Sequence, residues 1–306
     1  MSISKRAALR QHSIGHTGFD RYFYLLNNLF LFLYIVICLY PILYVFSSSF
    51  SSPQAVLTGK VRLWPVEFGF KGYTTVFKNQ SVFTGYKNSF IYTSIGTVLN
   101  VCFTLLAAYP LSRKELVGRT AISFLLAFTM WFNGGMIPTY LLIKDLGMIN
   151  TRMAMWFPGL VSVWNVIVTR TFIQNTIPEE LYESASLDGC TYRLYFQHIV
   201  LPLSGAIIAV VALFSGVGHW NAYFNAFLYL NNEKLFPLQI VLRNILLQNT
   251  VTTEALVDIG KDASEAGLQE LLKYSLIIVA AGPILCLYPF IQKYFVQGVM
   301  IGAIKG

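Results

Sequence analysis

The residues of this chain that could do chemistry are few, and none of them forms a catalytic group. Four histidines are scattered along the 306 residues, at His12, His16, His198 and His219. The sequence contains no Cys-x-x-Cys pair and no Gly-x-x-x-x-Gly-Lys-Ser/Thr phosphate loop. We therefore expect no metal and no cofactor on this chain, and no enzymatic activity of its own.

Aromatic side chains next to amides form a second chemical group. Flat aromatic faces beside hydrogen-bonding groups suit the recognition of sugars in a concave site. The candidates are Trp131 with Asn133, Trp164 with Asn165, and the cluster His219, Trp220, Asn221, Tyr223 and Asn225. Trp and Tyr also lie at lipid interfaces, and Asn bonds across helices. Both roles stay open, and the last cluster is the strongest candidate for a substrate pathway.

Residues 174–202 combine signals that start and stop helices. Thr176 can form a capping box with Glu179, and acidic residues suit the positive end of a helix dipole. Gly189 can take the left-handed conformation that ends a helix, and Thr191 can cap a second helix. We therefore predict a compact two-helix elbow, one side of which is low in profile and open to another protein.

The elements that must position these residues are membrane-spanning helices. The chain is 55% hydrophobic and only 12% charged, with a mean hydropathy of +0.57. A spanning helix needs roughly 20 mainly apolar residues and tolerates few charges near its centre. The long charge-free gaps predict an all-α membrane protein with six transmembrane helices, at about residues 22–46, 88–112, 120–143, 153–173, 202–230 and 274–292.

Between these spans, the elbow lies on the same side of the membrane as an N-terminal arm, residues 1–21. The arm is basic, and Arg113, Lys114 and Arg119 lie in a tight turn on the same side, so we place both termini in the cytoplasm. The outer loops are 51–87 and 231–272, and residues 22–306 form one transmembrane domain. The net charge of +8 is then explained by lipid headgroups and topology rather than by nucleic acid.

The elbow sequence resembles a known motif. Glu183-Ser184-Ala185, three residues, Gly189, nine residues, Ile199, one residue and Leu201-Pro202 are similar to the EAA motif of permease subunits in bacterial binding-protein-dependent ABC importers. The family has alanine where this chain has Ser184. The carboxyl-terminal residues 295–306, the Trp220-Asn221 stretch and residues 134–140 and 146–151 resemble the maltose-type carbohydrate permeases. The likeness is to their MalG-like half, in a branch for complex oligosaccharides.

The resemblance implies a type I ABC importer permease fold (MetI-like) in a bacterial cytoplasmic membrane, with the elbow as the coupling loop. It implies a second, MalF-like permease, two copies of a cytoplasmic ATPase that bind ATP and Mg, and an extracellular binding protein of the lipoprotein kind. Glu183 would meet a basic residue of the ATPase. The coupling residues so implied are Glu183, Ser184, Ala185, Gly189, Ile199, Leu201 and Pro202.

Two alternatives remain at the level of sequence. One is an ABC importer permease for a solute other than a sugar, which would share the elbow. The other is an ion-coupled secondary carrier, but the predicted spans lack the embedded Asp or Glu residues that relay protons. Within the resembling family, the companion permease can hold most of the bound sugar, so the substrate contacts of this chain are a separate question.

Overall fold

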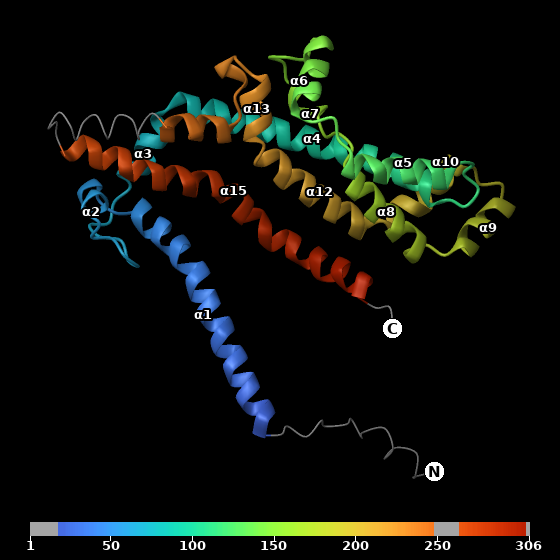
Figure 1. The fold of residues 1–306 in the computed structure, drawn as a ribbon, viewed down its shortest axis with the longest axis horizontal. Coiled ribbons are helices and arrows are strands. Elements are labelled where there is room, and N and C mark those ends of the chain that lie inside the picture. The colour runs from blue at the N-terminus through green and yellow to red at the C-terminus, as the bar shows by residue number, and fades with distance from the viewer. Residues whose placement is uncertain (1–17, 248–262, 304–306) are drawn as a thin grey trace.

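Helices are the only regular secondary structure in the residues that the structure describes, 18–247 and 263–303 of a computed structural model (Figure 1). Three of its helices are long and apolar enough to cross a bilayer by themselves: α1 (Gly18–Ser49), α4 (Gln80–Ser112) and α15 (Ala263–Ala303). They cover the first, second and sixth predicted spans. Helix α4 begins at Gln80, so it also includes the end of the predicted outer loop 51–87.

Two further spans are bent pairs of helices. The third predicted span contains α5 (Arg119–Trp131) and α6 (Met136–Asp145), which meet at 112°. Gly135, with φ 89°, precedes α6 and allows the sharp turn. The fifth predicted span, 202–230, contains α12 (Gly205–Trp220) and α13 (Tyr223–Tyr229). The helical run Tyr192–Leu203, most of which lies before that predicted span, is bent by 78° against α12.

The fourth predicted span is broken near its middle. It comprises α7 (Met153–Trp156) and α8 (Val163–Thr176), with irregular backbone at residues 157–162. Asn100 of α4 binds this backbone, because its Nδ2 donates to the carbonyl oxygens of Gly159 (3.1 Å) and Leu160 (2.9 Å). By length and composition the described residues provide three spans, or five if each bent pair counts as one. The count of six stays a prediction.

Helix α1 stands apart from the other helices along most of its length (Figure 1). Its apolar side chains are exposed all round from Tyr22 onward, and only its carboxyl-terminal end is buried. That end packs on α15, where the Tyr44 and Tyr274 rings lie edge to face at 5.7 Å. Such a helix suits lipid or another chain.

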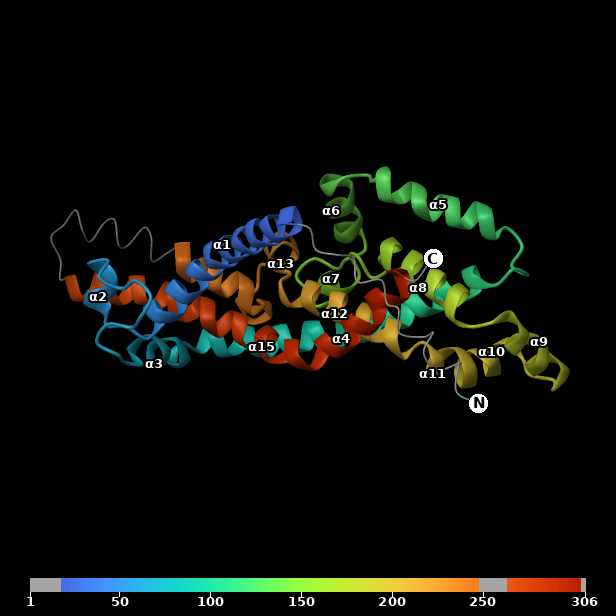
Figure 2. The ribbon, with the colours of Figure 1, turned by 90° about the horizontal axis from the view of Figure 1, so that it is seen from below.

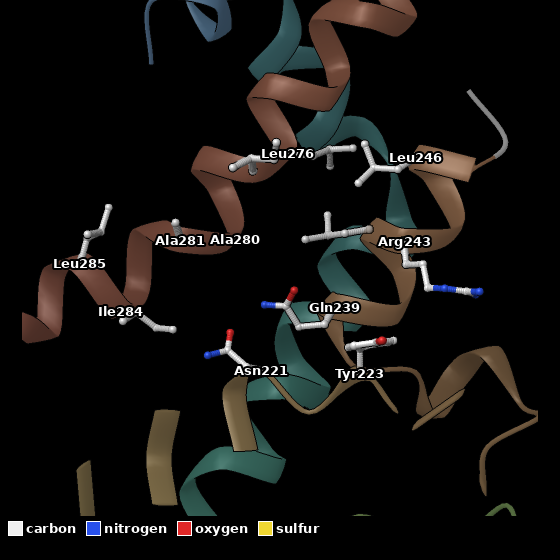
Figure 3. A pocket seen from close by; sticks show the side chains of 12 residues that line it. Asn221, Tyr223, Gln239, Arg243, Leu246, Leu276, Ala280, Ala281, Ile284 and Leu285 are labelled. Carbon is white, nitrogen blue, oxygen red and sulfur yellow. The ribbon is translucent and has the colours of Figure 1, made fainter. Parts of the chain in front are cut away.

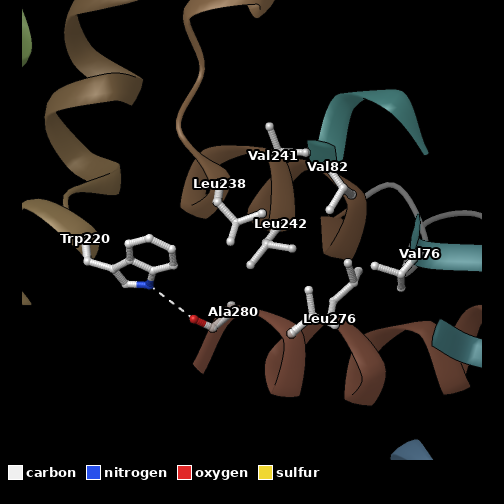
Figure 4. Packing of buried hydrophobic residues seen from close by; sticks show 9 residues of the cluster. Val76, Val82, Trp220, Leu238, Val241, Leu242, Leu276 and Ala280 are labelled. Carbon is white, nitrogen blue, oxygen red and sulfur yellow. Dashed lines mark hydrogen bonds between the residues drawn. The ribbon is translucent and has the colours of Figure 1, made fainter. Parts of the chain in front are cut away.

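The core at one end of the molecule joins segments that are far apart in the sequence (Figure 4). Short helices α2 (Pro53–Leu57) and α3 (Lys71–Lys78) follow α1. Val76 of α3, Val82 of α4, Leu238 of the helix Leu238–Leu247 and Leu276 of α15 pack together there. Within the predicted outer loop 231–272, the helix Leu238–Leu247 is therefore partly buried in this core, and residues 248–262 lie outside the described residues.

The elbow lies at the opposite end of the long axis from α2 and α3 (Figures 1 and 2). It is built from α9 (Glu179–Leu187), α10 (Tyr192–Tyr195), the π-helix η1 (Phe196–Val200) and α11 (Leu201–Leu203). A 3₁₀ turn, η2 (Glu233–Leu235), completes the described elements. Helix α4 packs along α12 and α8 and extends between the two ends.

Candidate functional site

The turn of the elbow has the geometry that its sequence predicts. Gly189 has φ 76°, and its N–H donates to the carbonyl oxygen of Ser186 at 3.0 Å. The N–H of Cys190 then donates to the carbonyl oxygen of Ala185 at 2.9 Å. Thr191 Oγ1 accepts a hydrogen bond from the N–H of Leu194, which caps α10. The predictions for Gly189 and Thr191 are confirmed.

The capping box predicted at the start of the elbow is wrong. Thr176 is the last residue of α8, and Pro178 occupies the cap position of α9 without a side-chain hydrogen bond. The Glu179 carboxylate pairs with the Lys114 ammonium group instead. The ion pair with Lys114 therefore forms in place of the local capping hydrogen bond.

Helix α9 has two different faces. Tyr182 and Ala185 face inward, against a cluster that includes Ile173, Tyr195 and Val200. Among the predicted coupling residues, Glu183, Ser184, Gly189 and Pro202 are exposed, whereas Ala185, Ile199 and Leu201 are half-buried. Leu187 at the tip of the elbow is 90% exposed. The outer face thus presents exposed carboxylates, small side chains and an exposed leucine.

The elbow is fastened to the end of α4 by residues that sequence reasoning did not single out as a site. The Arg113 guanidinium carbon lies 3.8 Å from the centre of the Tyr182 ring and 5.7 Å from that of Tyr195. The Tyr109 hydroxyl donates to the carbonyl oxygen of Tyr192 at 3.3 Å. A cation over an aromatic face is attracted by the ring quadrupole. An arginine directly after a charge-free span, facing an elbow rich in tyrosine, was the available signal.

The charges beside Arg113 form two ion pairs at the same junction. Arg113 binds the Glu115 carboxylate at 3.2 Å, and Lys114 binds Glu179 of α9. The hydrogen bond and charge of Glu179 raise the pKa of the Lys114 ammonium group above its usual value. The pKa of Glu115 is lowered, first by a hydrogen bond to its own backbone and then by Arg113. Lys114 and Glu115 are therefore both charged at neutral pH.

A second candidate site is a cavity of about 440 Å³ at the broken fourth span. Trp164 and Asn165 of α8, His219 of α12 and Asn225 of α13 line it together, so the structure joins four of the predicted pathway residues. Asn100 lines it as well. His219 Nε2 donates to Asn100 Oδ1 at 2.7 Å, since the amide Nδ2 already donates to the two carbonyls of the break.

The wall of the cavity also contains a buried hydroxyl without a hydrogen-bond partner among the described residues. This hydroxyl belongs to Ser215. Buried polar groups are nearly always satisfied by protein, water or ligand. The Trp164 side chain, 61% exposed, provides an aromatic face in the same cavity.

Asn221 and Tyr223 belong to a different cavity, of about 640 Å³, between α15 and the helix Leu238–Leu247 (Figure 3). Gln239 lines it with them, while the Arg243 guanidinium points away from it and lies 4.6 Å from the centre of the Phe227 ring. The other walls are apolar: Leu242, Leu246, Leu276, Ile277, Ala280, Ala281, Ile284 and Leu285.

Trp220, by contrast, is part of the core. Its ring is only 7% exposed, and its Nε1 donates to the carbonyl oxygen of Ala280 at 3.1 Å (Figure 4). It lines neither of these two cavities. Trp131, 81% exposed, and Asn133 lie at the bend between α5 and α6, where the Asn133 side chain accepts a hydrogen bond from the N–H of Gly135. The predicted pathway residues are thus divided among four surroundings.

These features define a class: a multi-pass helical membrane protein of the permease kind, with broken spans and an elbow at one end. No family model matches the chain. It is 37% identical over 287 residues to the polygalacturonan/rhamnogalacturonan transport system permease protein YtcP of Bacillus subtilis, with 94% of this chain and 99% of the relative covered. It is also 37% identical over 297 residues to protein LplC of the same organism, covering 96% and 99%.

A solved structure shows the same architecture. A chain from a bacterial ABC transporter involved in the import of the acidic polysaccharide alginate matches with a TM-score of 0.83 and 32% identity, over 91% of this chain and 98% of that one. The melibiose/raffinose/stachyose import permease protein MelC of Bacillus subtilis is 29% identical over 248 residues, covering 80% and 84%. The chain belongs to the family of permease subunits of sugar and oligosaccharide ABC transport systems. The family predicted from the elbow motif is confirmed.

Proposed function

We propose that this chain forms half of the translocation pathway of an ATP-driven importer for oligosaccharides, and that a cytoplasmic ATPase drives it through the elbow. The observation that carries the proposal is the outer face of α9, where Glu183 and Ser184 are exposed beside Leu187. The face is exposed in the isolated chain and backed by a packed cluster. A firmly held, exposed face of this kind suits a permanent protein partner.

The elbow side is the cytoplasmic side in this proposal, and both termini lie there. Two ATPase copies would hold ATP and Mg, one of them against this chain and the other against a second permease. A closing ATPase shifts the permease only if it contacts the elbow differently in the two states. Glu183 is an exposed charged group available for such a contact, and Gly189 fixes the angle at which α9 is presented.

The cavity at the broken span is the proposed place of substrate passage on this chain. Its volume lies within the range of small-molecule sites, and it combines Trp164, the Asn165 and Asn225 amides and the unpartnered Ser215 hydroxyl. Irregular backbone at membrane depth persists where it is buried or lines a cavity. The names of the relatives in turn mention polysaccharides and oligosaccharides. An extracellular binding protein would deliver such a substrate.

Reconstitution tests the proposal. Proteoliposomes would contain this chain, its companion permease and the ATPase, with the binding protein and a radiolabelled oligosaccharide outside. Uptake should require ATP inside, and an ion gradient should not replace it. Uptake by this chain without the ATPase would refute the proposal and favour a secondary carrier. ATP-dependent uptake of amino acids or peptides, but of no sugar, would favour the alternative importer.

A further inference from the structure

Arg113 is the most enclosed charged group at the junction between α4 and the elbow. Its side chain is 13% exposed, and its guanidinium lies against Tyr182 of α9 and Tyr195 of α10. The residue directly after α4 therefore touches both helices of the elbow. The attraction between a cation and a ring grows when both are removed from water. The neighbouring Lys114–Glu179 pair is largely exposed, with 72% and 37% of its side chains accessible, so solvent weakens it.

Side chains of α4 form hydrogen bonds with two further parts of the molecule. At its middle, Asn100 binds His219 and the backbone of the broken span, which are walls of the 440 Å³ cavity. Near its other end, Asn88 Nδ2 donates to the carbonyl oxygen of Lys234 at 2.8 Å, and the Tyr92 hydroxyl donates to that of Leu235 at 2.8 Å. Ser89 Oγ accepts from the N–H of Leu238 at 2.8 Å.

One helix of 33 residues, α4, connects the elbow junction, the cavity wall and the segment 234–238. At about 1.5 Å per residue such a helix is about 50 Å long. It is unbroken from Gln80 to Ser112, with Pro110 only in its last turn. A displacement applied at Arg113 is therefore carried to the cavity and to the segment 234–238 without a hinge.

We propose that Arg113 is the positioning residue that fastens the elbow to α4, so that α4 follows the elbow when the ATPase moves it. This inference rests on the proposed function and adds the residue and the helix through which the motion reaches the substrate cavity. The Tyr109 hydroxyl bond, at 3.3 Å, and the exposed Lys114 pair hold the same junction less firmly. Loss of Arg113 should therefore separate ATP hydrolysis from transport.

The test uses the complete importer, purified with its ATPase and reconstituted with binding protein and sugar. In Arg113→Ala the ATPase should stay bound and hydrolyse ATP at nearly the normal rate. The amount of sugar carried per ATP should fall by about twofold to thirtyfold, the range between an exposed and a desolvated cation–ring contact. Arg119→Ala is the matched control, because Arg119 lies in the same turn but donates only a 3.5 Å bond to the Arg113 carbonyl oxygen.

The partner ring supplies a second set of variants. Tyr182→Phe keeps the ring and should transport normally, whereas Tyr182→Leu removes it and should behave like Arg113→Ala. The double variant Arg113→Ala/Tyr182→Leu should be no worse than either single one, because both remove the same contact. Spin labels at Ser186 of α9 and Phe83 of α4 provide a spectroscopic readout. Their distance should stay constant on ATP binding in the normal protein and change in Arg113→Ala.

Gly189→Pro distinguishes a failure of this inference from a failure of the proposed function. If Gly189→Pro uncouples the importer and Arg113→Ala does not, this inference is wrong and the proposed function stands. If both variants leave sugar transport per ATP unchanged, the role of the elbow itself is wrong. If Arg113→Ala releases the ATPase altogether, Arg113 only maintains the elbow fold, and the inference is also wrong.

Discussion

At Gly189 the chain adopts a backbone conformation that side chains disfavour. Its φ of 76° ends α9 and sets the direction of α10. A β-carbon at this position would find no atom within 4 Å, so a substitution meets no steric obstacle. Any penalty must therefore come from the backbone conformation alone, and the exposed turn is a clean place to measure it.

Gly189→Ala should strain the elbow by about 1–2 kcal/mol, the cost of the left-handed region for a residue with a β-carbon. Gly189→Asn should cost less, because asparagine tolerates this region better. The measurement is ATP-dependent sugar uptake together with the fraction of ATPase that co-purifies. An equal loss of sugar uptake in Gly189→Ala and Gly189→Asn would show that the turn must lack a side chain, and that its φ angle does not limit the choice of residue.

Two of the three tryptophans of the predicted pathway, Trp164 and Trp220, have opposite surroundings, and this gives a paired prediction. Trp220→Phe removes the hydrogen bond to Ala280 and leaves a void in the core, so the free energy of unfolding should fall by about 1–3 kcal/mol. Trp164→Ala should hardly change it, but should raise the KM for sugar uptake.

Thermal unfolding in detergent and uptake kinetics in proteoliposomes measure the two effects. A stable Trp220→Phe protein with a raised KM would place Trp220 in the pathway after all. The sequence could not separate these residues, because the burial of Trp220 is decided by a carbonyl on α15, 60 positions away.

At the scale of elements, local signals were reliable only where no distant group competed. The turn at Gly189 and the cap at Thr191 depend on a few neighbouring atoms, and both form as predicted. The capping box at Glu179 fails because Lys114, from another element, takes the carboxylate. The charge-free gaps located the apolar segments, but they carry no information on bends. The breaks at residues 132–135 and 157–162 are held by contacts that such gaps do not encode, such as those of Asn100.

The Lys114–Glu179 pair leads to a prediction about pH. The pKa of Lys114 is raised above its usual value of 10.5, so the stabilisation is complete below that value and is lost only as the pH rises through the higher folded-state pKa. Attachment of the elbow should therefore not change between neutral and mildly alkaline pH.

Lys114→Gln should reduce sugar transport per ATP less than Arg113→Ala does, because the pair is exposed and screened by salt. The comparison is made at low and high ionic strength, and the difference between Lys114→Gln and the normal protein should vanish at high salt. A Lys114→Gln defect that equals that of Arg113→Ala at all salt concentrations would contradict the ranking of the two contacts.

At the scale of the whole molecule, apolar surface is divided between a packed core and helix α1. Ile37 of α1 is 70% exposed, whereas Leu276 of α15 is 1% exposed. Leu276→Ala should lower the free energy of unfolding of the isolated chain by about 2–5 kcal/mol. Ile37→Ala should change it by less than about 0.5 kcal/mol.

Thermal unfolding of the purified chain in detergent compares the two variants. Repeating the measurement on the assembled importer then shows what covers α1. A loss of stability for Ile37→Ala only in the assembly identifies another subunit, and no loss in either sample identifies lipid. If Ile37→Ala destabilised the isolated chain as much as Leu276→Ala does, the result would contradict the exposed position of α1.

The contact between α1 and α15 also has a consequence for the order of synthesis. Tyr44 and Ser49 near the end of α1 meet Tyr274 and Ser275 of α15, so α1 leaves the ribosome more than 200 residues before its partner. Until α15 is made, the apolar length of α1 faces lipid, while its carboxyl-terminal end can already contact Leu63 and Tyr73. A helix that is apolar on all sides and forms its backbone hydrogen bonds internally can wait in the bilayer without cost. Formation of the contact between α1 and α15 therefore shows that the last span has been synthesised.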